Sequence, residues 1–296
     1  MIRNLFFAVL VCSLFVTMVL AEGTKNGWEL NLQQLSLNLT STEVHNSAPE
    51  FSQTRLKADS QTSIQGKLDF FANYFASKLF WSNGLKAEYG KTYVRPIDKE
   101  ETITENANKI LLTTDLTYRL WKIENFLGGF EAGPFANIGY ETEFDATEVE
   151  IGGVKKRHLR QIIRAKAGAK LFEGKYLKEL YIAAVGESDF TYSPTSDKFA
   201  CEAGFRAETD VRDGVKFIAW SYYRNYLSQS KEYTSDLEYE VEAELRLDVK
   251  LWNNLAVAPF VNYYSASAKR FNCVAENWYT GISLSYSTFF VKAKEI

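Results

Sequence analysis

The stretch 237–251 alternates between apolar and polar residues without interruption. Every odd-numbered position from Leu237 to Leu251 is apolar, and every even-numbered position from Glu238 to Lys250 is polar or charged. In a helix this period of two would scatter the apolar side chains around the axis, whereas in a strand it gathers them on one face. At roughly 3.3 Å per residue the strand would be about 50 Å long. The pattern therefore predicts one long strand with an apolar face and a charged face, as a membrane-spanning β-barrel requires.

Weaker versions of this alternation recur along the chain and predict about twelve strands. They occupy residues 28–39, 62–75, 80–91, 109–121, 126–144, 158–172, 177–192, 198–211, 215–228, 237–251, 255–267 and 277–290. The phase slips at Gln33-Gln34, which predicts a bulge. Pro259 predicts a local distortion, because proline lacks the N–H that a paired strand needs. The fold class we expect is all-β, a transmembrane antiparallel up-and-down β-barrel of about twelve strands.

The connections between these segments differ in length. Polar stretches at 40–60, 92–108, 145–157 and 267–276 predict loops, and short turns follow the second, fourth, sixth, eighth and tenth strands. The connections after the seventh and ninth strands are of modest length and fit this rule less well. Outer-membrane barrels combine short periplasmic turns with long outer loops, and an even strand count puts both chain ends on the periplasmic side.

Aromatic residues make up 15% of the sequence and gather where the predicted strands end. We assign them to two membrane interfaces, because paired aromatic bands are typical of such barrels. The group at the short turns is Trp81, Trp121, Phe126, Phe172, Tyr176 and Trp252, and the opposite group is Tyr89, Tyr140, Tyr192, Tyr226, Tyr264 and Trp278. The alternative is that these rings belong to an ordinary core.

Residues 1–21 have the features of a cleaved secretory signal peptide. Arg3 supplies the positive start, residues 5–20 are apolar, and Val19-Leu20-Ala21 offers small residues for cleavage. An uncleaved membrane anchor is the alternative, and the sequence before Cys12 does not fit a lipoprotein. We therefore expect a signal peptide at 1–21, a single barrel domain at 22–296, and a location in the cell outer membrane.

Composition narrows the chemistry. The net charge of −3 argues against a nucleic-acid partner. Cys201 and Cys273 are chemically able to pair after export, and the sequence leaves that pairing open. Together with His45 and His158 they make a structural zinc site improbable, and we expect no metal and no cofactor.

No motif of a phosphate-binding loop, metalloprotease or serine hydrolase occurs in the sequence, so we do not expect an enzyme. A barrel lipid hydrolase would need a serine–histidine pair oriented by a third group. His158 ends the basic run that starts at Lys155. The run is either a solvated strand end or a surface that binds anions such as lipopolysaccharide phosphates.

Three stretches resemble a family of uncharacterised Gram-negative outer-membrane β-barrels. They are Leu79–Thr92 (LFWSNGLKAEYGKT), Asn106–Trp121 (NANKILLTTDLTYRLW) and Gly129–Phe144 (GFEAGPFANIGYETEF). The chain is more distantly similar to the salt-induced outer-membrane protein family. The resemblance covers most of the mature chain and implies a barrel in the outer membrane, with no catalytic residues.

Residues 279–286 resemble the C-terminal signal that the barrel-assembly machinery reads, although the chain continues to Ile296 instead of ending on an aromatic residue. The partners we expect are therefore the outer-membrane lipid bilayer and the barrel-assembly machinery, while the oligomeric state stays open.

The charged faces of the strands suggest a function. Basic residues of the sixth strand and acidic residues of the tenth would face each other obliquely across the lumen and select solutes in a narrow channel. The residues predicted to line the lumen are Arg164, Lys166, Lys170, Glu202, Arg206, Glu238, Glu240, Glu242, Glu244 and Arg246.

The function we expect is a narrow passive channel for small solutes. In the main alternative the charges pair with their neighbours and fill the lumen, which gives a non-conducting structural or envelope-stress barrel. A surface-binding barrel and a barrel lipid hydrolase are further alternatives. A soluble secreted β-protein with its apolar faces inside is the rival architecture.

Overall fold

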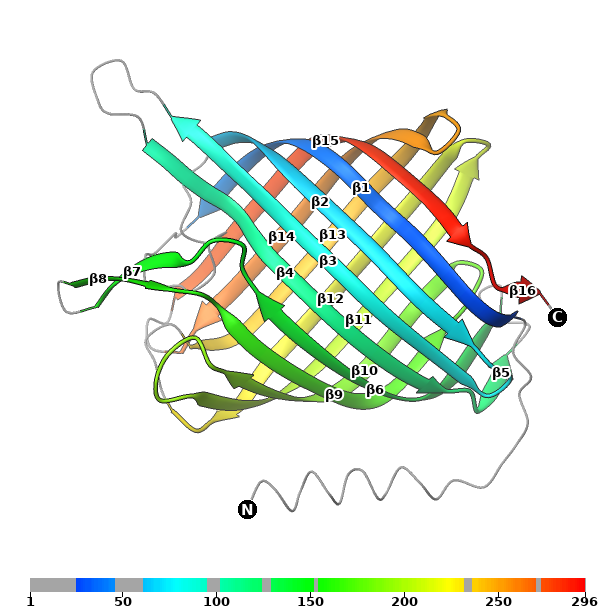
Figure 1. Cartoon of the computed structure of the whole chain (residues 1–296), viewed down its shortest axis with the longest axis horizontal. Helices are drawn as coiled ribbons and strands as arrows, with labels where there is room; N and C mark the ends of the chain where they lie inside the picture. The colour runs from blue at the N-terminus through cyan, green and yellow to red at the C-terminus, as the bar shows by residue number, and fades with distance from the viewer. Residues whose placement is uncertain are drawn as a thin grey trace.

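The computed structural model describes residues 25–45, 61–94, 102–123, 129–151, 154–231, 236–269 and 273–295, and these form an all-β protein (Figure 1). Fourteen strands make one antiparallel sheet whose first long strand pairs with its last, so the sheet closes into a barrel. The twelve long strands that form the wall are β1 (Lys25–His45), β2 (Gln61–Phe75), β3 (Leu79–Val94), β4 (Thr102–Tyr118), β6 (Phe130–Thr142), β9 (Gln161–Phe172), β10 (Leu177–Asp189), β11 (Ser196–Arg212), β12 (Val215–Gln229), β13 (Leu237–Trp252), β14 (Leu255–Ala268) and β15 (Cys273–Val291). The predicted fold class is confirmed.

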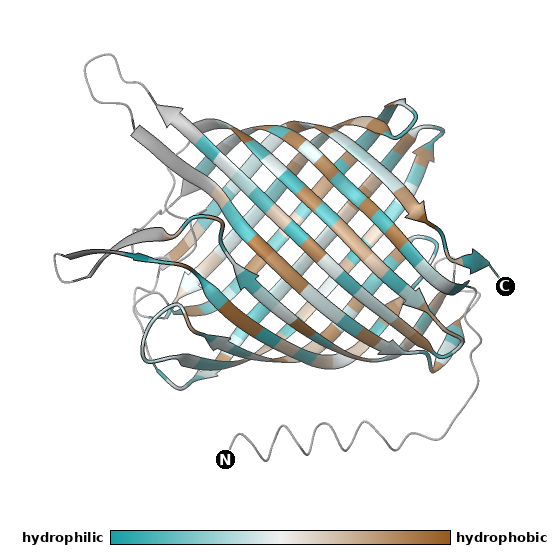
Figure 2. Cartoon of the chain, in the orientation of Figure 1, coloured by the Kyte–Doolittle hydropathy of each residue, from teal (hydrophilic) through white to brown (hydrophobic). Residues whose placement is uncertain are grey.

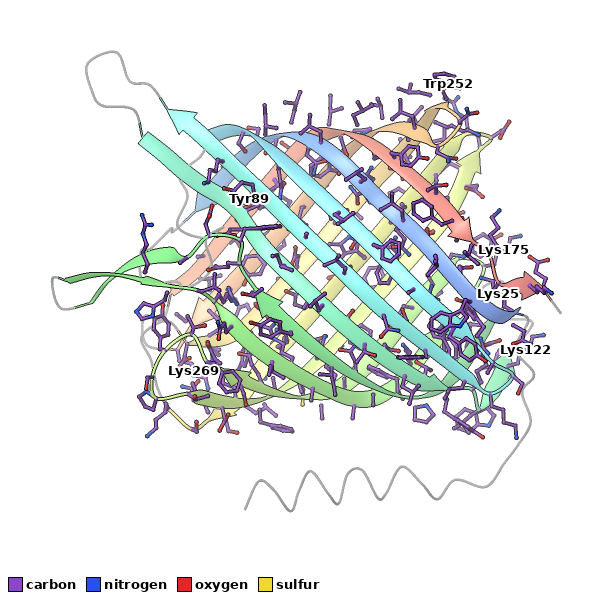
Figure 3. All side chains as sticks on the ribbon, viewed as in Figure 1. Lys25, Tyr89, Lys122, Lys175, Trp252 and Lys269 are labelled. Atoms are coloured by element: carbon purple, nitrogen blue, oxygen red, sulfur yellow. The ribbon has the colours of Figure 1, made fainter. Side chains whose placement is uncertain are left out.

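Two short strands extend the wall at the end that carries the short turns. β5 (Trp121–Ile123) pairs with β6, and β16 (Lys294–Glu295) pairs with the start of β1. The two ends of the described chain therefore lie side by side at this end of the barrel (Figure 1). Lys25, Lys122 and Lys175 mark the short-turn end in Figure 3, and Tyr89 and Lys269 lie toward the opposite end, which carries the longer connections.

The wall has an apolar outer face and a polar inner face. Along β1, Leu35, Leu37 and Leu39 are more than half exposed, while Asn38 and Thr40 between and beside them are buried. Apolar and polar residues consequently alternate along the strands of the barrel wall in Figure 2. This is the reverse of a soluble β-protein, whose apolar faces would point inward, and it is the organisation of a transmembrane barrel.

The sequence predicts two irregular sites in the strands, a bulge at Gln33-Gln34 and a distortion at Pro259. At Gln33-Gln34 the register of β1 shifts against both of its neighbours, which confirms the bulge. Around Pro259 the register stays constant, and the β13–β14 ladder passes from the pair Arg246–Phe260 to the pair Val249–Val257. The missing proline N–H thus interrupts the ladder locally without adding a residue.

Several predicted loops are shorter than expected, because the strands continue beyond the membrane-spanning part. β4 begins at Thr102 instead of residue 109, and β15 begins at Cys273 instead of residue 277. Segment 145–157, predicted as a loop, contains β7 (Thr147–Ile151) and β8 (Val154–His158), which pair into a separate hairpin that projects from the barrel (Figure 1). The two short segments flank Gly152-Gly153, a sequence typical of hairpins.

The two aromatic bands are only partly as predicted. Trp81, Trp121, Tyr176, Trp252 and Trp278 are exposed on the outer surface. In contrast, Phe172, Tyr226 and Tyr264 are buried inside the barrel, where the two tyrosines pack with apolar residues of β10, β11 and β14. These three assignments were wrong, because the phase of a residue along its strand decides which face it joins, and position near a strand end does not.

The remaining predictions concern the signal peptide, one aromatic residue, the cysteines and helices that could span a membrane. The signal peptide at 1–21 and Phe126 lie outside the described residues. Cys201 is a free, exposed cysteine, and the described part of the chain contains no helix long and apolar enough to cross a membrane.

Candidate functional site

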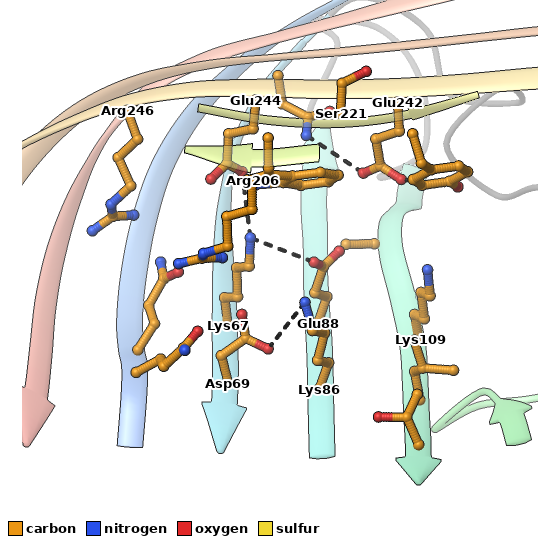
Figure 4. A pocket seen from close by; sticks show the side chains of 18 of the residues that line it. Lys67, Asp69, Lys86, Glu88, Lys109, Arg206, Ser221, Glu242, Glu244 and Arg246 are labelled. Carbon is orange, nitrogen blue, oxygen red and sulfur yellow. Dashed lines mark hydrogen bonds and ion pairs between the residues drawn. The ribbon is translucent and has the colours of Figure 1, made fainter. Parts of the chain in front are cut away.

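A polar cavity of about 360 Å³ lies inside the barrel and is lined by residues of all twelve long strands. Its lining extends from Glu143 and Arg160 near the longer connections to Asp248 and Ser287 near the short turns. Figure 4 shows charged side chains of several strands converging on it. Since each strand alternates between its two faces, every second residue of a strand reaches this lumen.

Eight of the ten predicted lining residues reach this cavity: Arg164, Lys166, Glu202, Arg206, Glu240, Glu242, Glu244 and Arg246. Lys170 is also buried, but it lies nearer the short turns, with its ammonium 4.9 Å from the centre of the Phe135 ring. Glu238 departs from the prediction, because a register shift between Leu237 and Tyr239 takes it out of phase. It is exposed and accepts a 3.2 Å hydrogen bond from Ser267 Oγ.

Most of the inward charges pair with charges on neighbouring strands. Arg164 on β9 contacts Glu141 on β6 and lies 2.6 Å from Glu187 on β10. Glu187 is also 3.4 Å from Lys198 on β11, which lies 3.1 Å from Asp236. Burying a charge costs several kcal/mol unless an opposite charge and hydrogen bonds compensate. The inward charges from β6 to β11 therefore form a series of ion pairs that offsets the cost of burying them, and we call this series the ion-pair ladder.

A second part of the ladder is centred on Arg224 of β12. Its guanidinium binds Glu202 on β11 at 2.5 Å and also contacts Glu240 on β13. Lys166 also contacts Glu202, and Tyr264 Oη donates to Glu240 at 2.9 Å. The acidic residues of β13 thus do not face the basic residues of β9 as two opposed rings. That expectation is corrected, because Glu240 pairs with Arg224 on the adjacent strand β12, and Lys166 of β9 pairs with Glu202 on β11, two strands away.

The ion pair between Lys67 and Glu244 joins two strands that are not neighbours in the sheet. Lys67 Nζ on β2 lies 3.3 Å from Glu244 Oε2 on β13, and 3.7 Å from Glu88 on β3 (Figure 4). It also lies 5.9 Å from the centre of the Trp220 ring. Because β14, β15 and β1 stand between β13 and β2, this pair forms a chord across the lumen. We call it the Lys67–Glu244 strap.

The short-turn end of the lumen holds a cluster of cations and rings around Arg119. This arginine is 1% exposed and contacts the Glu131 carboxylate and the carbonyl oxygen of Ala76. Its guanidinium lies 5.8 Å from the centre of the Phe75 ring and 5.9 Å from that of Phe172. Arg119 thereby joins the turn after β2 to β6 and β9, and the cluster narrows this end of the barrel.

Sequence reasoning did not single out Arg119, Arg224, Lys67 or Glu187. The strand phase was a sufficient signal to place Lys67, Glu187 and Arg224 on the inner face. Their partners could not be read in the same way, because they depend on the exact register between strands and, for Lys67 and Glu244, on how the barrel closes.

The segment after β6 is fixed to the barrel outside the membrane-spanning strands. Asp145 Oδ2 accepts hydrogen bonds from Tyr89 Oη at 2.7 Å and from Lys91 Nζ at 3.1 Å. These two bonds, with that from Tyr89 the stronger influence, hold the pKa of Asp145 below its ordinary value of 3.8. Asn108 accepts a 2.8 Å hydrogen bond from the Phe144 N–H, so the anchor involves both side chains and backbone.

His158 lies at the end of the hairpin strand β8, beside an aromatic ring. The ring of His158 packs against Tyr192, with 4.9 Å between the ring centres. Among the described residues, no group of three His, Cys, Asp or Glu side chains is arranged to hold a metal ion. The side chains of Lys155 and Lys156, which begin the basic run, lie outside what the structure describes.

Comparisons with known proteins give the following. Residues 50–132 match a family described as "Protein of unknown function (DUF3078)". None of the curated proteins matches the chain.

Solved structures that are similar to this chain include the COG4313 outer membrane channel from Pseudomonas putida F1, with 12% identity, a TM-score of 0.44, and coverage of 93% of this chain and 100% of that chain. The anion-selective porin from Comamonas acidovorans has 10% identity, a TM-score of 0.36, and coverage of 88% and 99%. The translocator domain of autotransporter NalP from Neisseria meningitidis has 10% identity, a TM-score of 0.37, and coverage of 96% and 94%.

Proposed function

We propose that the protein is an outer-membrane barrel that acts as a narrow passive channel for small hydrophilic solutes. The observation that carries the proposal is the polar cavity to which all twelve strands contribute. A barrel made only to stabilise a membrane would need no hollow lined by charges, since burying charges is costly. The eight predicted residues that reach the cavity are the ones we assign to the solute path.

The pairing of the charges determines what kind of channel this is. Because Arg164 and Arg224 each contact a carboxylate on an adjacent strand and Lys166 contacts Glu202 two strands away, their fields largely cancel at a distance. We therefore expect weak selectivity between cations and anions. The Lys67–Glu244 strap crosses the lumen, so we expect a small conductance that the strap limits.

The experiment is single-channel recording of the refolded full chain in a planar bilayer. The wild type is expected to give small discrete steps, and the double variant Lys67→Met/Glu244→Met larger ones, because it removes both ends of the strap together. Lys216→Met is the matched control, since this lysine is half exposed and lies outside the cavity lining, and its steps should equal those of the wild type. A correctly folded wild type that conducts no current would overturn the channel.

The second candidate is a non-conducting structural or envelope-stress barrel. The observation in its favour is the Arg119 cluster at the short-turn end of the lumen, where Phe75 and Phe172 are almost fully buried. If this second function holds, the folded barrel conducts no current even when the strap is removed, so the same recordings separate the two functions.

The remaining parts of the proposal follow from the sequence. We place the protein in the outer membrane after cleavage at residue 21 and insertion by the barrel-assembly machinery, with no catalytic step of its own. The likeness to salt-induced outer-membrane proteins stays a prediction. Membrane fractionation with mass spectrometry of the mature N-terminus tests these points, and recovery in the inner membrane with residues 1–21 attached would contradict them.

A further inference from the structure

The cavity has one sector without charged side chains. Among the described lining residues, those from the three adjacent strands β14, β15 and β1 are all uncharged, while every charged one comes from the rest of the barrel. Its members include Gln33, Gln34 and Asn38 of β1 and Phe260 of β14. We call it the neutral sector. The strap residues Lys67 and Glu244 stand on β2 and β13, which flank it on either side.

Asn38 gives this sector an unused hydrogen-bond acceptor. Its side chain is 3% exposed and lines the cavity, and its Oδ1 has no hydrogen-bond partner. Directly beside it on β15, Ser283 Oγ is also buried without a partner. Buried polar groups in proteins are nearly always satisfied. A molecule in the cavity that donates a hydrogen bond would therefore satisfy the Asn38 acceptor.

The bulge in β1 adds two amides to the same sector. Gln33 and Gln34 are consecutive in sequence, and a regular strand would point them to opposite faces, yet both line the cavity. Bulges often re-aim a side chain in this way next to a functional site. Gln34 Nε2 donates to Ser36 Oγ at 2.9 Å, and the amide groups of the sector supply both donors and acceptors.

Phe260 completes the sector with an aromatic surface. It is paired directly with Gly281 on β15, and a Cβ at position 281 would lie 3.1 Å from two of its ring atoms. The glycine therefore lets the ring lie close against the wall and leaves room in front of it. Apolar faces with a few converging polar groups are the usual composition of small-molecule sites, and about 360 Å³ lies within their usual range.

We propose that the neutral sector binds an uncharged, hydroxyl-rich solute such as a sugar or a polyol. A hydroxyl donates to Asn38 Oδ1 and accepts from an amide N–H, so it matches both halves of the sector. A charged solute would lose its hydration beside groups whose nearest charges are already paired, since Lys67 pairs with Glu244 and Arg246 with Asp248. This inference rests on the proposed channel, for which it names the class of solute.

The test measures binding and conduction separately on the full-length protein. Isothermal titration in detergent with glucose, xylitol, gluconate and glucosamine reports binding whether or not the barrel conducts. Block of the single-channel current by the same four compounds reports occupancy of the path. Glucose and xylitol should bind and block the current, while gluconate and glucosamine should do so far more weakly.

Asn38→Leu removes the acceptor at similar volume and should weaken glucose binding by roughly 3- to 10-fold, which corresponds to one hydrogen bond. Asn137→Leu is the matched control, since Asn137 lines the same cavity from β6, outside the neutral sector, and it should bind as the wild type does. If Asn38→Leu fails to fold, Gln33→Leu tests the same sector and should also weaken binding.

Each outcome assigns failure to one hypothesis. Binding of glucose by a silent barrel would overturn the channel and keep the site. Conduction without binding of glucose or xylitol, or binding that Asn38→Leu and Gln33→Leu leave unchanged, would overturn the site and leave water as its occupant. Equal affinity for glucose and gluconate would overturn the preference for uncharged solutes.

Discussion

The ring of Tyr181 on β10 covers Gly204, its direct partner on β11. A Cβ at position 204 would lie 2.6 Å from Cε1 of the tyrosine, a separation that real structures do not show. From this position Tyr181 Oη donates to Glu202 at 2.5 Å, so the glycine lets the ring reach the ion-pair ladder. Phe71 with Gly84 and Phe260 with Gly281 repeat the arrangement, which holds aromatic rings against the wall.

Replacing Gly204 by alanine should therefore displace Tyr181 and break its bond to Glu202. We expect a loss of about 1–3 kcal/mol in the free energy of unfolding, as is typical of an overpacked interior. Urea titration followed by tryptophan fluorescence measures it. Gly186→Ala on β10 is the control, because a Cβ there meets nothing within 4 Å. Equal stability of the two variants would show that the ring is free to move.

The Lys67–Glu244 strap should behave as a coupled pair. Lys67→Met alone leaves the Glu244 carboxylate, which is 8% exposed, without its closest cation, and should cost about 3–5 kcal/mol of unfolding free energy. The double variant Lys67→Met/Glu244→Met should recover most of that loss. A double-mutant cycle in urea measures the coupling, and additive single effects would mean that the two groups do not interact in the membrane.

Arg119 should be essential for stability at the short-turn end. Arg119→Met removes the partner of Glu131 and the donor to the Ala76 carbonyl, and should cost about 3–5 kcal/mol because it leaves a buried carboxylate unpaired. Adding Glu131→Gln should restore part of the loss. Arg212→Met, at an exposed position of β11, should change stability by no more than about 0.5 kcal/mol. The heat-modifiable shift of the folded barrel in electrophoresis reports all three variants.

The attachment of Asp145 should depend on pH. A carboxyl with a depressed pKa stabilises the folded arrangement above its ordinary pKa, 3.8 in this case, and loses this contribution as the pH falls through the lower folded value. Pepsin cleavage beside Phe144 should thus accelerate below about pH 3.8. Asp145→Asn should be cleaved readily at every acid pH. Wild-type cleavage that follows the variant's pH profile would show that the two hydrogen bonds do not hold the segment.

The sequence was sufficient for the barrel because each strand carries its two faces in its own residues, as the stretch from Leu237 to Leu251 does without a break. The sequence was less informative where a local shift in a strand changes which side chains face the lumen. Glu238 left the lumen through a local register shift, and Tyr226 and Tyr264 joined it because strand phase outweighed their place near a strand end. The ion-pair ladder could not be predicted, since it depends on the exact register between each pair of strands.

The bulge at Gln33-Gln34 has a consequence for assembly. It lies in β1, the strand that closes the sheet by pairing with β15, and it shifts the register against both neighbours. A slip of one residue at this seam would turn Leu35 and its neighbours inward, so the bulge defines where the last strand can join. Closure also pairs the first strand with the last, so the sheet cannot close until both strands are present. A barrel that lacks β15 would expose β1 and β14 as open edges, and we expect such a chain to be degraded or aggregated before it could form a smaller pore.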